Sequence, residues 1–157
     1  NLFGTVTNIK APEIEPNSLE IKTLGSVGTY SLSMNSVKEL KSSATLTGYD
    51  MKVFKQIADP TKELTMTIYA EIKEYDGASL TSQKSLKIKM RGTCSKFQLL
   101  GEMKAQENIE FPMEFNNTAV KKTIDGKDIY EIDIPNYIYK VNGVDLLAKT
   151  KKNLGLS

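Results

Sequence analysis

The sequence predicts a mainly β domain, a barrel or sandwich of about seven or eight strands, with one short internal helix and a C-terminal helix. Apolar and polar residues alternate with a period of two over several segments, which is typical of half-buried strands. Asp-Gly and Asn-Gly pairs, which favour tight turns, lie between such segments. The chain has 157 residues, so we expect residues 1–157 to form a single domain.

Four shorter strand candidates lie in the N-terminal third of the chain. They cover Phe3 to Ile9, Ser18 to Leu24, Tyr30 to Met34 and Lys41 to Thr47. Pro12 and Pro16 interrupt the first two, since proline cannot donate a backbone N–H to a ladder.

A short helix is expected directly after these strands. Asp50 can cap its N-terminus, and Asp59-Pro60 ends it. One face of this helix would carry Met51, Phe54 and Ile57.

The clearest alternation predicts a long antiparallel hairpin in the middle of the chain. Its first strand places Leu64, Met66, Ile68, Ala70 and Ile72 on one face. The pattern returns from Leu86 to Arg91, after a polar stretch at Asp76 to Ser79 that can reverse the chain.

Two further strands and a helix are predicted in the C-terminal third. Ile109 to Phe115 alternates, with Pro112 favouring an edge or a bulge. Asp125-Gly126 then turns the chain into a strand over Ile129 to Ile134, which predicts a second hairpin. Val144 to Leu154 is expected to form the C-terminal helix, with lysines in its later turns and Gly155 after its end.

The residue types needed for most enzymatic chemistry are missing. The chain has no histidine and only one cysteine, Cys94, which excludes Ser-His-Asp and Cys-His catalysis, a Cys/His zinc site and an intrachain disulfide. The acidic residues Asp125, Asp128, Glu131 and Asp133 could bind calcium or act as a carboxylate pair, although a turn and a solvated strand face explain them better. We expect no enzymatic activity, no cofactor and no metal.

The charge pattern disfavours a dedicated nucleic-acid-binding protein. Basic and acidic residues nearly balance, at 21 and 19, and both signs are mixed along the chain. One basic stripe is formed by Lys84, Lys87, Lys89 and Arg91; it could contact DNA or an acidic partner, or be a solvated strand face. No apolar run is long enough to span a bilayer and no signal-peptide pattern is present, so we expect no membrane binding by this chain.

Two sets of motifs carry a resemblance to a known family. The first is the C-terminal run from Thr123 to Ile134, followed by Val141 to Leu147 and Leu154-Gly155-Leu156; the second is Leu46 to Gln56. In order and spacing they resemble the major tail tube proteins of contractile-tailed bacteriophages and R-type tailocins. The resemblance covers most of the chain from Leu40 onward, and it implies a further short segment ahead of Asn1.

The resemblance implies a structural subunit with a split β-barrel. Such subunits form hexameric rings that stack into a tube, with a central channel for the passage of a genome or ions. The implied partners are further copies of the chain and the tail sheath, tape measure, baseplate and tail terminator proteins, with DNA only transiently in the lumen of a phage. The implied location is a virion tail or a tailocin particle assembled in the host bacterial cytoplasm, and phage and tailocin are not distinguished.

Three groups of residues are candidates for assembly contacts. The central hairpin would line the inner wall, with Thr65, Thr67, Tyr69, Glu71, Lys87, Lys89 and Arg91 facing the lumen. The glycine-rich loop Leu24, Gly25, Ser26, Val27 and Gly28 would become ordered between stacked rings. Lys149, Lys151 and Lys152 would contact an acidic sheath partner.

Two other classes of function stay open at this point. A monomeric β-barrel module that binds a ligand or peptide would need a concave aromatic patch, whereas the tyrosines are scattered over different segments. A carboxylate-based enzyme built around Asp125 would need a strongly perturbed carboxyl group in a pocket.

Overall fold

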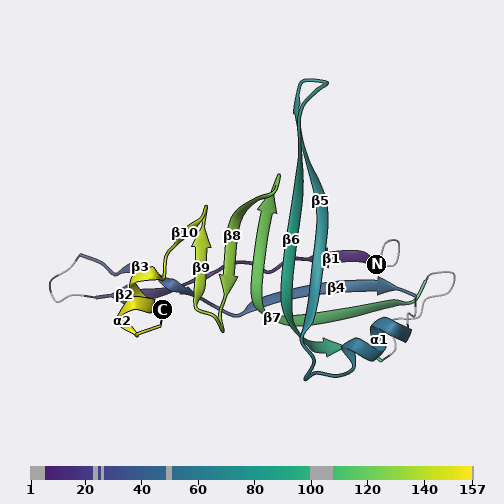
Figure 1. The fold of residues 1–157 in the computed structure, drawn as a ribbon, viewed down its shortest axis with the longest axis horizontal. Helices are drawn as coiled ribbons and strands as arrows, with labels where there is room; N and C mark the ends of the chain where they lie inside the picture. Colours follow the sequence, from purple (N-terminus) through teal and green to yellow (C-terminus); the bar gives the residue numbers. More distant parts are fainter. Residues whose placement is uncertain (1–5, 23–24, 26, 49–50, 100–107, 157) are drawn as a thin grey trace.

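The computed structural model describes residues 6–22, 25, 27–48, 51–99 and 108–156 and is mainly β (Figure 1). Its strands are β1 (Val6–Lys10), β2 (Pro16–Ile21), β3 (Tyr30–Val37), β4 (Leu40–Thr47), β5 (Leu64–Asp76), β6 (Ser79–Phe97), β7 (Glu110–Ile124), β8 (Lys127–Asp133), β9 (Ile138–Val141) and β10 (Val144–Asp145). The predicted internal and C-terminal helices are α1 (Met51–Ile57) and α2 (Ala148–Asn153). The expected cap at Asp50 and the expected strand start at Phe3 lie outside the described residues.

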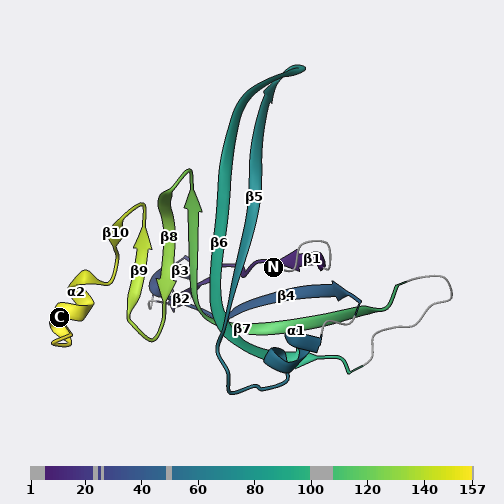
Figure 2. The same ribbon diagram turned by 45° about the vertical axis from the view of Figure 1, so that its right-hand side comes forward.

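The long strand β7 organises the main antiparallel sheet. β6 pairs along one side of β7, while the other side is shared between two partners. The first half of β7 pairs with β4 as far as Asn117, and the second half pairs with β8 from Ala119 onward. The sheet therefore splits at Asn117, and its two parts run crosswise (Figures 1 and 2). The described strands do not close into a barrel.

Each part of the split sheet has its own hydrophobic core. The core beside α1 contains Ala44, Leu46, Phe54, Ile57, Cys94, Phe111, Met113 and Phe115. The core beneath β5 to β9 contains Leu40, Met90, Val120, Ile132 and Tyr139. In the central hairpin and in the first half of β7, the period-two pattern correctly predicted that Met66, Met90, Phe111, Met113 and Phe115 lie on the inner face.

Both predicted hairpins are confirmed. β5 and β6 pair from Leu64↔Gly92 to Asp76↔Ser79, and β7 and β8 meet at the Asp125-Gly126 turn. Pro112 pairs only with Thr45 of β4, because the ladder between β7 and β6 ends at Met113. This position suits a residue without a backbone N–H.

Three predicted details are wrong. Met51 is exposed, so the buried face of α1 consists of Phe54 and Ile57. Ala70 is also exposed, because β7 ends opposite Leu86 and the remainder of the β5–β6 hairpin projects beyond the sheet (Figure 2). The third detail is the start of the C-terminal helix.

This helix begins only at Ala148. The Asn142-Gly143 turn, with φ of 49° and 82°, reverses the chain so that Val144 and Asp145 pair with β9 as β10. Positive φ at both central residues is the requirement of a tight hairpin turn, and this local geometry overrides helix propensity.

Candidate assembly surface

The predicted lumen-facing residues lie on one face of the β5–β6 hairpin. Cross-strand pairing places Thr65 opposite Arg91, Thr67 opposite Lys89 and Tyr69 opposite Lys87. All of the predicted residues on this face are exposed except Arg91, which is half-buried. Lys84 does not belong to the predicted basic stripe: it pairs opposite Ile72 on the other face and bonds to Glu74 at 3.1 Å.

Local contacts hold the side chains of this face in place. The Lys87 ammonium lies 5.6 Å from the centre of the Tyr69 ring, a cation–π distance. Two hydrogen bonds lower the pKa of Glu71, the larger effect coming from Gln83 and the smaller from Lys73. The Lys73 ammonium lies 3.0 Å from the Glu71 carboxylate.

Arg91 connects the hairpin to the rest of the sheet. Its guanidinium lies 3.1 Å from Glu63 and 2.9 Å from Asp133 on β8. This bridge ties the base of β6 to β8 across β7. Arg91 is thus engaged within the subunit.

The same face continues across β7, β8 and β9 as a band of mixed charge. One row of side chains crosses four strands: Lys89 of β6 lies opposite Lys121 of β7. Lys121 in turn lies opposite Glu131 of β8, and Glu131 lies opposite Lys140 of β9. The Lys121 ammonium lies 2.8 Å from Asp128, and this hydrogen bond raises the pKa of Lys121. The surface is therefore polar with both signs present.

The outer edge of β5 is the longest free strand edge among the described residues. β5 has 13 residues and pairs only with β6. At the opposite end of this part of the sheet, β9 has 4 residues and β10 has 2. A free edge presents unpaired N–H and C=O groups that can pair with another chain.

Comparison with known proteins identifies the family of this chain. Residues 1–155 match the family described as phage tail tube protein FII. The chain belongs to this family. It is also 39% identical over 72 residues to the tail tube protein of Escherichia phage P2. The aligned part makes up 46% of this chain and 41% of that relative.

The predicted stacking loop of this tail tube family member lies at the tip of the β2–β3 hairpin. Gly25 adopts φ of 88°, which suits glycine, and the Val27 side chain is fully exposed. Gly28 is also exposed. Leu24 and Ser26 lie outside the described residues.

The three lysines proposed for the sheath contact differ in their surroundings. Lys149 and Lys152 are exposed on α2. The Lys151 ammonium lies 2.9 Å from Asp145 and is half-buried. This hydrogen bond, with a second one from the Leu147 N–H, lowers the pKa of Asp145. Lys151 therefore anchors α2, and the other two lysines are available to a partner.

The acidic residues near the second turn do not converge on one site. Asp125 accepts a hydrogen bond from the Ser85 N–H at 2.8 Å, while Asp128 pairs with Lys121 and Asp133 with Arg91. No group of metal-binding side chains occurs in the part of the chain that the structure describes. The only cysteine, Cys94, is buried, which raises the pKa of its thiol.

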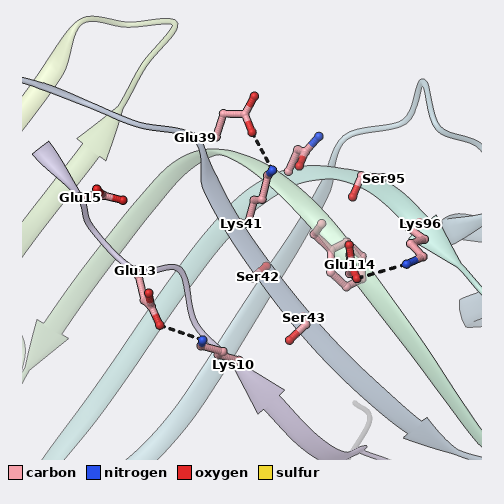
Figure 3. Close-up of a pocket in the computed structure, with 12 residues that line it drawn as sticks. Lys10, Glu13, Glu15, Glu39, Lys41, Ser42, Ser43, Ser95, Lys96 and Glu114 are labelled. Carbon is pink, nitrogen blue, oxygen red and sulfur yellow. Dashed lines mark ion pairs between the residues drawn. The ribbon is translucent and has the colours of Figure 1, made fainter. Parts of the chain in front are cut away.

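A groove of about 730 Å³ lies over β1, β4 and β7 (Figure 3). Local ion pairs lie along its walls, between Lys10 and Glu13 at 2.8 Å and between Lys41 and Glu39 at 2.9 Å (Figure 3). Serines and further charged residues line most of the remainder, with Phe115 as its one aromatic residue. The groove thus lacks the concave aromatic patch that a ligand-binding module would need.

One pairing in the core was missed at the sequence level. Tyr130 and Tyr139, which are nine residues apart, lie with their hydroxyl oxygens 2.7 Å apart inside the second core. Burial is the main cause that raises the pKa of Tyr130, and the hydrogen bond to Tyr139 raises this pKa further. Only knowledge that β8 and β9 pair could have revealed this contact.

Proposed function

We propose that this chain is the structural, non-enzymatic subunit of the inner tail tube of a contractile phage tail or tailocin. Residues 1–157 act as a single tail tube domain, and copies of it form hexameric rings that stack around a central channel for genome or ion passage. Membership of the tail tube protein family supports a structural role in a tail. The observation that carries the ring arrangement is the free 13-residue edge of β5.

The free edge gives each copy a way to bind its neighbour. In a closed ring of identical subunits, each contact is head-to-tail, so one edge of a copy meets a different edge of the next copy. β5 provides the long edge, and β9 and β10 provide the opposite one. Backbone hydrogen bonds between them would extend the sheet around the ring.

The polar face of the hairpin suits the wall of a water-filled channel. The opposite face of β5 and β6 packs on the second core through Met66, Ile68, Ile88 and Met90, so the face with Thr67 and Lys89 is left for the lumen. Its lysines are interspersed with carboxylates. A channel wall that carries both charge signs would bind DNA less tightly than a uniformly basic wall. This fits a channel through which DNA only passes.

The remaining partners follow from the same proposal. Lys149 and Lys152 face the tail sheath protein, while tape measure, baseplate and tail terminator proteins act at the ends of the tube. The chain would reside in a virion tail or tailocin particle after assembly in the host cytoplasm. Among the described residues, no helix is long and apolar enough to cross a bilayer.

Residue-resolved hydrogen exchange tests the proposed use of the β5 edge. In free subunits, the N–H groups of β5 that do not bond to β6 exchange rapidly, because they face water. In assembled material they become protected by the neighbouring copy. The amides of the stacking loop residues Gly25 and Val27 are expected to exchange more slowly only when rings stack.

β7 serves as the internal control, because strands pair along both of its sides. Its amides are expected to exchange slowly in both states. Equal exchange at β5 in free and assembled material would contradict edge pairing around the ring.

A further inference from the structure

The turn between β9 and β10 contains the only Asn-Gly pair in the sequence, Asn142-Gly143 (Figure 1). Both residues are exposed. A Cβ atom built on Gly143 would meet nothing within 4 Å in the described structure. The Gly143 backbone is therefore crowded neither by a side chain of its own nor by a packed neighbour at this point.

This pair carries the groups for an intramolecular reaction. The Gly143 nitrogen can attack the carbonyl carbon of the Asn142 side chain and close a five-membered succinimide ring. The proton of this nitrogen and the side-chain amino group leave together as ammonia. Water then opens the ring at either carbonyl, which gives aspartate or isoaspartate. In isoaspartate the main chain runs through Cβ and Cγ, so it is one carbon atom longer.

Ring closure requires a change in the backbone dihedral angles of the turn, and little resists this change. β10 has two residues and, among the described strands, pairs only with β9. The two pairs are Val144 opposite Val141 and Asp145 opposite Lys140. The Val144 side chain is 63% exposed. Short edge segments with little burial open at a small cost in free energy, so we expect the turn to open locally.

The C-terminal helix depends on the short strand that follows this turn. The Asp145 carboxylate accepts hydrogen bonds from the Leu147 N–H at 3.0 Å and from the Lys151 ammonium at 2.9 Å. α2 buries no residue of its own, so these bonds and the packing of Leu147 on the second core hold it in place. Because turn geometry fixes the register of a hairpin, a longer backbone at the turn would move Asp145 away from its position opposite Lys140.

We propose that Asn142 is a site of spontaneous deamidation and that isoaspartate at this position releases α2 from the sheet. The reaction needs water as its only co-reactant. It is a property of the folded subunit, and it does not depend on whether copies of the chain form a tube. The attachment of the C-terminal helix thus weakens as the protein ages.

Mass spectrometry of the folded chain, after incubation in mildly alkaline buffer, tests whether Asn142 reacts. Trypsin releases the peptide from Val141 to Lys149, in which deamidation raises the mass and the two products separate by chromatography. Asn116 is the internal control, because it is exposed but lies in β7 with strands paired on both sides. We expect Asn142 to react roughly tenfold or more faster than Asn116.

The variant Asn142→Gly is the matched control chain. It has no side-chain amide at this position, and Gly-Gly also favours the tight hairpin turn, so we expect it to stay folded and unmodified. If Asn142 stays intact in the folded chain while the same chain unfolded in urea reacts there, the turn protects its asparagine and the proposal is wrong.

Hydrogen exchange at α2 tests the effect of the reaction. After incubation, the amides of residues 148–153 are expected to exchange faster in the modified chain than in Asn142→Gly treated in the same way. Equal exchange in the two chains would show that the attachment of α2 does not depend on this turn, which would overturn the proposed release of the helix.

Discussion

Gly92 lies where β6 passes the split in the sheet. It pairs with Asn117, next to a β-bulge that follows Arg91. A Cβ atom at this position would lie 2.6 Å from the Asn117 Cα and even closer to the Asn116 carbonyl oxygen. The Asn117 side chain, which donates hydrogen bonds to the Leu40 carbonyl and the Ser42 hydroxyl, fixes β4 at the same point. Only glycine fits at this position, because a Cβ atom would overlap the backbone of β7.

Gly92→Ala is therefore expected to lower the free energy of unfolding by about 3 kcal/mol or more, since the backbone of β7 must move. Gly126→Ala is the control: its φ is 76°, but nothing lies within 4 Å of the place a Cβ would take, so only about 1 kcal/mol is expected. Chemical denaturation of both variants measures the difference. Equal losses would show that the close approach at Gly92 carries no special cost.

At the scale of single residues, the sequence predicted burial better than contacts. Alternation correctly separated Thr67 and Lys89 from Met66 and Met90. It could not show that Arg91 is held by Glu63 and Asp133, because these partners depend on which strands become neighbours.

Among the elements, α2 is held by few contacts of its own. It has no buried residue, and its connection to the fold runs through Leu147 and the ion pair of Lys151 with Asp145. A helix that buries little in the subunit leaves its surface to a partner. This places the two exposed lysines on a surface that a partner can reach.

Lys149→Glu with Lys152→Glu is expected to weaken binding of the tail sheath protein about fivefold or more while tubes still form, because reversed charges repel an acidic partner. Lys55→Glu with Lys127→Glu, which reverses two exposed charges elsewhere, is the charge-matched control. Co-sedimentation of tubes with sheath protein measures the effect. If both variants bind sheath as the unchanged tube does, the contact lies elsewhere.

Elements with strong local signals were predicted, and those without them were not. The Leu64 to Arg91 hairpin has both alternation and a turn signal. β9 and β10 are short, with 4 and 2 residues, so neither shows a recognisable period. The split in β7 at Asn117 depends on two partners from distant parts of the chain, which local patterns do not reveal.

The whole molecule is an open sheet with surfaces left for other chains. The tip of the long hairpin projects beyond the end of β7, the outer edge of β5 is unpaired among the described residues, and the β2–β3 ribbon is a separate sheet (Figures 1 and 2). Composition and alternation predicted the fold class, but they did not predict the unpaired edge of β5 or the separate ribbon. The motif from Thr123 to Leu156 pointed to assembly through its resemblance to tail tube proteins.

On this proposal, copies of the chain complete one another in stacked rings. Electron microscopy of the purified chain over a rising concentration series tests it most directly. We predict rings with six-fold symmetry that stack into hollow tubes as the concentration increases. A population of separate single subunits at every concentration would contradict the claim.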